Sequence, residues 1–129
     1  MHLSIHTWLV RYEGLVILID TGIGNGKDRP FSALFHHTPG HSVAHFSIAL
    51  ESGGAEALFT GDVMHDPVQV QRPELGSVFC GDLARARRSR EWLLGYAAER
   101  DATLFTAHFP EPSAGKVARG AGGFAWTYL

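Results

Sequence analysis

Three short segments of the sequence each deliver a side chain of a type that binds metal ions. His41 stands in Thr-Pro-Gly-His-Ser, Asp62 in Leu-Phe-Thr-Gly-Asp and His108 in Leu-Phe-Thr-Ala-His. Short apolar or turn-forming runs of this kind end in loops that present ligands on a rigid sheet. Imidazole and carboxylate groups suit zinc, and also iron or manganese. We therefore expect His41, Asp62 and His108 to be metal ligands, with a turn aspartate and a boundary histidine as the plain alternatives for Asp62 and His108.

Histidine is dense around the first two of these segments. The chain has eight histidines, and five of them fall within thirty residues, namely His36, His37, His41, His45 and His65. A solvated or packing role explains any one of them, but the density favours a metal site. Adjacent residues of an extended chain point to opposite faces. Only one of His36 and His37 is therefore expected to reach a metal shared with His41.

The length and composition indicate a single globular domain over residues 1–129. Apolar residues make up 45% and charged residues 19%, which is typical of a globular chain. A formal charge of -2 gives no reason to expect nucleic acid or an anionic membrane as a partner. No apolar run approaches the roughly 20 residues that span a bilayer. Since no secretory signal is recognisable and the single Cys80 cannot form an internal disulfide, we expect a cytoplasmic protein.

The first thirty residues predict a β-hairpin followed by an irregular loop. Residues 4–10 have the β-branched and aromatic content of a strand, a Glu-Gly pair at 13–14 marks a turn, and residues 15–19 predict a buried strand. Glycines at positions 22, 24 and 26 then predict a loop. Their spacing differs from the Gly-x-Gly-x-x-Gly of dinucleotide-binding proteins, which argues against a nucleotide-binding function.

The rest of the chain predicts strands and one helix. We expect strands at 44–51, 56–60 and 103–106, and a last edge strand at 124–128. The segment between Asp62 and Gly81 has two prolines and no helical period, which predicts a long loop.

A helix is expected to follow that loop. Asp82 is a good N-cap. The apolar face of the helix is supplied by Ala86, Leu93, Leu94 and Ala97. A solvated face is expected to carry Arg85, Arg87, Arg88, Arg90 and Arg100.

The motifs together resemble the metallo-β-lactamase superfamily of metal-dependent hydrolases. The resemblance rests on Thr38–Ser42, Phe59–Asp62 and Ala107–Pro110, preceded by the Asp-Thr-Gly turn that begins at Asp20. The stretch from Gly61 to Pro73 is similar to the subgroup with quorum-quenching lactonases and related esterases. The resemblance implies an α/β fold, the αββα sandwich of that family. The fold is expected to be truncated here, because the family's His-x-His-x-Asp-His motif is absent. The expected deletion lies between about residues 31 and 38.

The resemblance also implies roles for single residues. Up to two divalent metals, zinc above all, would be held by His41 and His108 with Asp62 as the bridge. Asp62 and His65 are the expected catalytic residues, although a solvated loop histidine is an equal alternative for His65. Around the ligands, Asp20 and His45 are expected in supporting positions. His36 or His37 could substitute for the missing ligands.

Two functions follow from these expectations. The first is a metal-dependent hydrolase that acts on a small-molecule ester or lactone through a metal-bound hydroxide. The second is a catalytically inactive remnant, or a binding or dimerisation module of the same fold. The missing segment would leave sheet edges and apolar strands uncovered, and a homodimer is one arrangement that would cover them.

Overall fold

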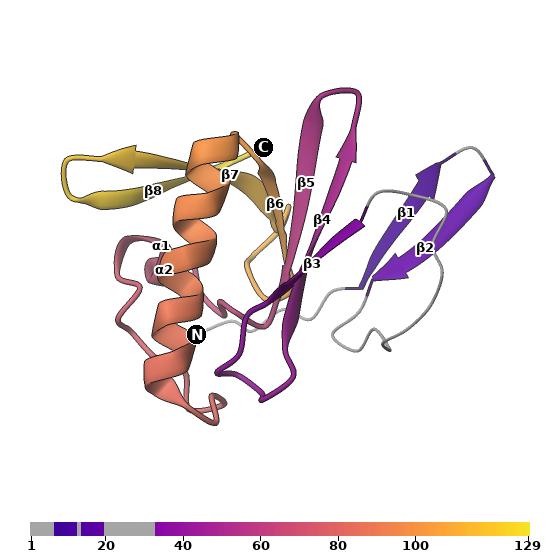
Figure 1. The fold of residues 1–129 in the computed structure, drawn as a ribbon. Coiled ribbons are helices and arrows are strands. Elements are labelled where there is room, and N and C mark those ends of the chain that lie inside the picture. Colours follow the sequence, from indigo (N-terminus) through magenta and orange to yellow (C-terminus); the bar gives the residue numbers. More distant parts are fainter. Residues whose placement is uncertain (1–6, 13, 20–32) are drawn as a thin grey trace.

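A computed structural model describes residues 7–12, 14–19 and 33–129 of the chain (Figure 1). Asp20 and the expected glycine loop lie outside the described residues. The first strands are β1 (Trp8–Tyr12), β2 (Leu15–Ile19), β3 (Ala33–His37), β4 (Phe46–Ser52) and β5 (Ala55–Gly61). Two helices, α1 (Val68–Gln71) and α2 (Leu83–Arg100), come next, followed by β6 (Thr103–Thr106), β7 (Ala114–Gly120) and β8 (Gly123–Tyr128).

The strands form two sheets. β1 and β2 pair as a hairpin, with Leu9 opposite Leu18, while β3 to β8 form a six-stranded sheet in sequence order. Neighbouring strands of the larger sheet are antiparallel except β5 and β6, which are parallel and are connected through the two helices. The carboxyl ends of β5 and β6 therefore meet at the same edge of the sheet, where Asp62 and His108 follow them.

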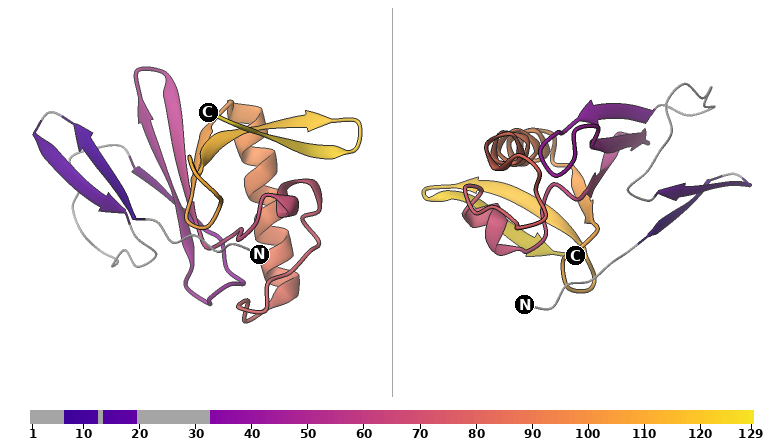
Figure 2. Two further views of the ribbon diagram at one scale, coloured as in Figure 1. Left: turned by 180° about the vertical axis from the view of Figure 1, so that it is seen from behind. Right: turned by 90° about the horizontal axis from the view of Figure 1, so that it is seen from below.

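The larger sheet has α2 on one face and the hairpin on the side of the other, as Figure 2 shows from behind and from below. Alternation along β5 explains why, since successive side chains of a strand point to opposite faces. Leu58 is buried in the cluster under α2, and its neighbour Phe59 is buried in the cluster under the β1–β2 hairpin. The order of layers is hairpin, sheet, helix.

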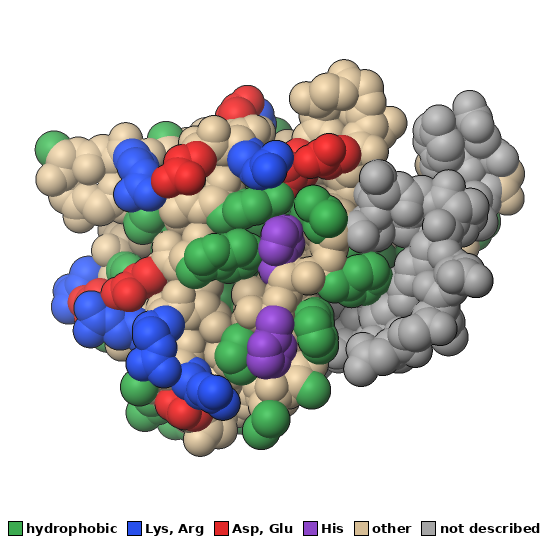
Figure 3. All heavy atoms as spheres, viewed as in Figure 1, with side chains coloured by type: hydrophobic (Ala, Val, Ile, Leu, Met, Phe, Trp, Pro, Cys, Tyr) green, Lys and Arg blue, Asp and Glu red, His purple; other side chains and the backbone are tan. Residues whose placement is uncertain are grey.

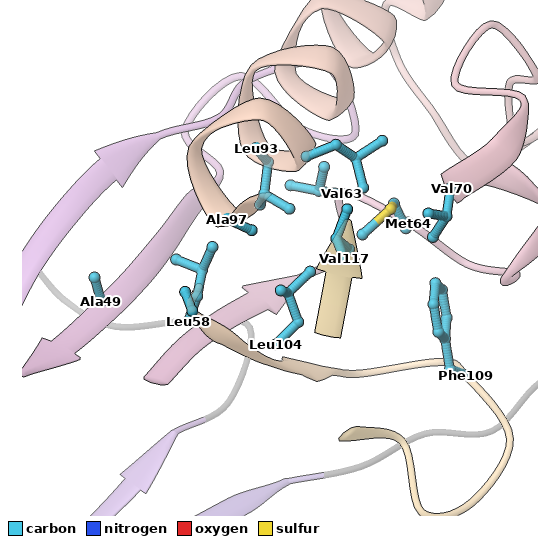
Figure 4. Close-up of a cluster of buried hydrophobic side chains, with 12 residues drawn as sticks. Ala49, Leu58, Val63, Met64, Val70, Leu93, Ala97, Leu104, Phe109 and Val117 are labelled. Carbon is cyan, nitrogen blue, oxygen red and sulfur yellow. The ribbon is translucent and has the colours of Figure 1, made fainter. Parts of the chain in front are cut away.

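The core under α2 is made of aliphatic and aromatic side chains from helix, sheet and loop. Figure 4 shows Leu93 and Ala97 of α2 pointing toward Leu58, Leu104 and the end of β7. On the other face, the outward side of the hairpin leaves Leu9, Val16 and Leu18 exposed. No helix among the described residues is both long and apolar enough to cross a membrane.

Most of the expected elements are confirmed. The hairpin, the strands before Asp62 and His108, the edge strand at the C-terminal end and the helix all form. The side chain of Asp82 caps α2 by accepting a hydrogen bond from the backbone N–H of Arg85 at 2.9 Å. The mixed α/β fold class is confirmed as well.

Four expectations about the elements were wrong. Residues 33–37 form β3 and residues 114–120 form β7, although neither strand was predicted. The expected loop after Asp62 contains the single-turn helix α1.

The fourth error concerns Arg90, which was expected on the solvated face of α2 but has no exposed surface at all. Its Nε donates to the Pro73 carbonyl at 2.9 Å and its Nη1 to the Val63 carbonyl at 3.4 Å. The spacing Ala86, Arg90, Leu93 places it on the apolar stripe, so helical geometry outweighs the preference of a charge for water.

Candidate metal centre

Asp62 lies between two imidazole rings. Its Oδ2 is 3.1 Å from His41 Nε2 and its Oδ1 is 3.0 Å from His108 Nε2. Asp62 follows β5 and His108 lies two residues beyond β6, so the parallel pairing of these strands brings the two together. His41 comes from the loop between β3 and β4. The structure thus places all three expected ligands side by side.

The charge on Asp62 follows from this arrangement. Burial of the carboxyl group raises its pKa. The hydrogen bond from His108 and the charges of His108 and His41 act in the opposite direction and prevail, so the pKa of Asp62 lies below its ordinary value. Asp62 is therefore a carboxylate at neutral pH.

His45 fixes the backbone of Asp62. The ring is buried, and its Nε2 accepts a hydrogen bond from the Asp62 N–H at 2.9 Å. Since an N–H can only donate, Nδ1 must carry the ring proton and donate to Thr38 Oγ1, 2.9 Å away. Thr38 in turn contacts Ser47 Oγ at 3.1 Å, and Ser47 donates to the Thr60 carbonyl at 3.1 Å. Burial lowers the pKa of His45, which agrees with this neutral form.

Gly61 makes the approach of His45 to Asp62 feasible. A Cβ atom on Gly61 would lie 2.6 Å from His45 Nε2, and its φ of 55° lies in the left-handed region that favours glycine. The strand pairing between β5 and β6 is irregular between Phe59 and Gly61. Gly61 is therefore required because a side chain at this position would collide with His45, which supports Asp62.

His65 lies against the two histidines expected to bind metal. Its ring is stacked on His108 with 4.8 Å between centroids and an interplanar angle of 6°, and it is 5.2 Å from the ring of His41. Burial, followed by the charges of His108 and His41, lowers the pKa of His65 to about 4. His65 is neutral at pH 7, and its buried Nδ1 has no hydrogen-bond partner among the described residues.

The loop that carries His65 is fixed by residues that sequence reasoning missed. Gln69 Oε1 accepts the backbone N–H of His65 at 2.6 Å, and its Nε2 donates to the Leu75 carbonyl at 2.8 Å. Arg90 holds the same loop through Pro73 and Val63. For Arg90 the helical spacing was an available signal, whereas nothing in the sequence marks Gln69.

The other expected residues lie elsewhere or outside the described part. The ring of His36 packs on α2, with centroids 4.9 Å from Trp92 and 4.8 Å from Tyr96. His37 is exposed, with its Nε2 3.1 Å from the Val43 carbonyl. Alternation along β3 turns the two rings to opposite faces, and the structure brings neither of them to Asp62. Asp20 is not among the described residues.

Each of the two imidazole–carboxylate pairs matches a divalent cation in donor type and spacing. Zinc bonds of about 2.0–2.2 Å to nitrogen and oxygen place two donors of one ion about 3 to 3.5 Å apart, as the two imidazole–carboxylate pairs are. Each pair supplies two donors, whereas a catalytic zinc ion has three protein ligands. In residues 7–12, 14–19 and 33–129 no three His, Cys, Asp or Glu side chains are grouped so as to hold one ion. A catalytic zinc ion at either pair would therefore need a further ligand.

Comparison with known proteins agrees with the geometry. The family model described as the metallo-beta-lactamase superfamily matches residues 30–108. No curated protein matches the chain.

Solved structures resemble the chain in fold. AidC, a dizinc quorum-quenching lactonase in complex with its product, is 27% identical with a TM-score of 0.73, over 81% of this chain and 36% of AidC. AbOPH, a hydrolase in the beta lactamase superfamily, is 28% identical with a TM-score of 0.74, over 81% of this chain and 36% of AbOPH. A probable metal-dependent hydrolase from Staphylococcus aureus is 20% identical with a TM-score of 0.65, over 81% of this chain and 37% of that protein, and supports the fold alone. This chain thus spans little more than a third of the length of these proteins.

Proposed function

Because this chain belongs to the metallo-beta-lactamase superfamily, we propose that it takes part in the metal-dependent hydrolysis of an ester or lactone. The observation that supports the proposal is the position of Asp62, whose two carboxylate oxygens each face a different imidazole Nε2. A carboxylate that faces one donor on each side is suited to bridge two cations. His41, Asp62 and His108 are the residues proposed to hold them.

When bound, such cations would polarise a carbonyl group and make a water molecule acidic. The chain's own residues have separate tasks. Asp62 supplies the negative charge, and His45 keeps its backbone in place while remaining neutral. His65, the second residue proposed to be catalytic, packs a neutral ring against the rings of His41 and His108.

The proposed substrate class follows from the relatives. AidC is a lactonase, and its structure holds the product N-hexanoyl-L-homoserine. An N-acyl homoserine lactone is therefore the first substrate to test for this chain, followed by aryl esters. Zinc is the first metal to test, followed by manganese and iron.

A second candidate function is a non-catalytic one. The described residues provide two donors for each ion, and the family's His-x-His-x-Asp-His motif does not occur in the sequence. Two donors are fewer than a catalytic zinc ion needs, so this count is compatible with a binding or dimerisation module that has the same fold but does not turn over a substrate.

Metal content and turnover separate the two candidates. The protein would be purified with trace zinc, analysed for metal per chain and assayed with N-hexanoyl homoserine lactone. Asp62→Asn is the test variant. His37→Asn is the matched control, because His37 is exposed and its Nε2 lies against the Val43 carbonyl instead of Asp62.

The proposal expects close to two metals per chain and lactone turnover, both lost in Asp62→Asn and both kept in His37→Asn. Metal near zero together with no turnover in the unmodified protein would support the non-catalytic candidate. Turnover that survives Asp62→Asn would contradict the role proposed for Asp62.

A further inference from the structure

A pocket separate from the histidine cluster lies between helix α2 and the loop after β3. It has a volume of about 320 Å³ and is lined by His37, Pro39, Arg85, Arg88, Ser89 and Trp92. None of the residues around Asp62 lines it. The volume lies at the lower end of the range found for small-molecule sites.

Two arginine side chains give this pocket positive charge. Arg85 and Arg88 are exposed, and no ion pair joins either of them to the described residues. The nearby carboxylate of Asp82 is engaged in capping the helix. By contrast, Arg87 on the neighbouring face of α2 is paired with Glu91 at 2.7 Å. Figure 3 shows Lys and Arg side chains gathered over the lower end of α2, beside hydrophobic side chains.

The wall of the pocket combines these cations with an aromatic ring. Residues 85, 88 and 92 follow the spacing i, i+3 and i+7, which places them on one stripe of the helix. Trp92 is 42% exposed although its ring contacts His36 and Tyr96, so part of the indole remains accessible to a ligand. Guanidinium groups bind phosphate through charge-assisted hydrogen bonds, and indole rings stack on planar groups.

We propose that this pocket binds a small-molecule phosphate monoester of a planar ring, with Arg85 and Arg88 on the phosphate and Trp92 against the ring. A dianionic phosphate matches two fixed positive charges. The pocket floor is held by Ser89, whose Oγ donates to the Pro39 carbonyl at 2.7 Å. Pro39 is two residues from His41, so the ligand would contact the loop that carries one expected metal ligand, while the site itself does not depend on metal.

Titration of the isotope-labelled protein with phenyl phosphate, followed by two-dimensional amide NMR, tests the proposal. The expected result is saturable one-to-one binding, with shifts in residues 85–92 and in the Trp92 indole signal. Inorganic phosphate should bind more weakly because it lacks the ring. In the Arg85→Gln, Arg88→Gln double variant binding should weaken about tenfold or more, because two charge-assisted contacts are lost.

Two further variants test whether binding depends on the pocket itself. Arg87→Gln removes a charge from the same helix outside the pocket and should change the affinity less than about twofold. Trp92→Leu should reduce phenyl phosphate to the affinity of inorganic phosphate. The proposal is overturned by an absence of saturable binding, by equal losses in Arg87→Gln and in the double variant, or by shifts confined to Asp62, His65 and His108.

Discussion

The Nε2 atom of His45 accepts the backbone N–H of Asp62 over 2.9 Å, which ties the expected bridging carboxylate to a buried ring. Because that ring is fixed on its other side by Thr38, neither the tautomer nor the orientation of His45 is free. The position of Asp62 is therefore set by a side chain seventeen residues earlier in the sequence.

Replacing His45 by Ala should weaken both the fold and the site. The Asp62 N–H and the Thr38 hydroxyl each lose a buried partner, and unsatisfied buried groups cost about 1–3 kcal/mol. Metal affinity should fall about 10–100-fold, as for other residues that support ligands. Urea unfolding and metal titration measure the two effects. His37 is an exposed histidine of the same segment, and His37→Ala should leave the free energy of unfolding and the metal affinity unchanged within error. Losses in His37→Ala equal to those in His45→Ala would contradict the role given to His45.

Gly61→Ala should destabilise the protein more than Gly53→Ala. Both glycines have positive φ, 55° and 58°, so both variants pay a left-handed backbone cost of about 1–2 kcal/mol. A Cβ atom on Gly53 meets nothing within 4 Å, whereas one on Gly61 lies 2.6 Å from His45 Nε2. The difference in free energy of unfolding between the two variants isolates the contact with His45. Equal stabilities would show that His45 is free to move away.

Arg90→Ala should lower the free energy of unfolding by about 2–4 kcal/mol, because the side chain is fully buried and donates to two loop carbonyls. Arg87→Ala on the same helix breaks only an exposed pair with Glu91 and should cost less than about 1 kcal/mol. Thermal and chemical unfolding of the two variants provide the comparison. Similar losses in both would mean that the charge, and not the burial, determines the contribution of Arg90.

Stability should decline as the pH falls below the ordinary histidine pKa of about 6.5. Burial is the main cause of the lowered pKa of His36, opposed by Glu56 and assisted by Arg100. The unfolded chain binds its proton at a higher pH than the folded chain, so protons favour unfolding in the window below 6.5 and have no such effect above it. Urea midpoints at pH 7.5 and 5.5 measure this, and the difference between them should shrink in His36→Phe. An unchanged difference would assign the dependence to other groups.

Local sequence patterns were sufficient to predict the β1–β2 hairpin, the strands before Asp62 and His108, and helix α2. The strands before Asp62 and His108 each contain a Leu-Phe-Thr run, and the candidate ligands follow directly after these strands. By contrast, β7 carries two glycines and two cations over Ala114–Gly120 and becomes a strand only because β6 and β8 flank it.

The three candidate ligands of the site could be predicted from the sequence, whereas the residues packed around them could be predicted less well. Asp62 and His108 meet because β5 and β6 are parallel, a pairing that was not predicted, and His41 joins them from the loop between β3 and β4. His36 and His37 were correctly expected on opposite faces, but only the packing of α2 on β3 decides that His36 faces Trp92 and Tyr96 instead of the ligands.

The loop that carries His41 is joined to the start of α2 at Gly40 and His41. The Gly40 and His41 carbonyls accept the backbone N–H groups of Asp82 and Gly81 at 2.9 and 3.1 Å, and a Cβ on Gly40 would lie 2.1 Å from the Ala86 nitrogen. Neither segment can open without breaking the hydrogen bonds of the other. Amide hydrogen exchange at Gly81 and Asp82 should therefore slow when a bound ion immobilises His41. The exchange rates of these two amides would then report whether the candidate metal centre is occupied.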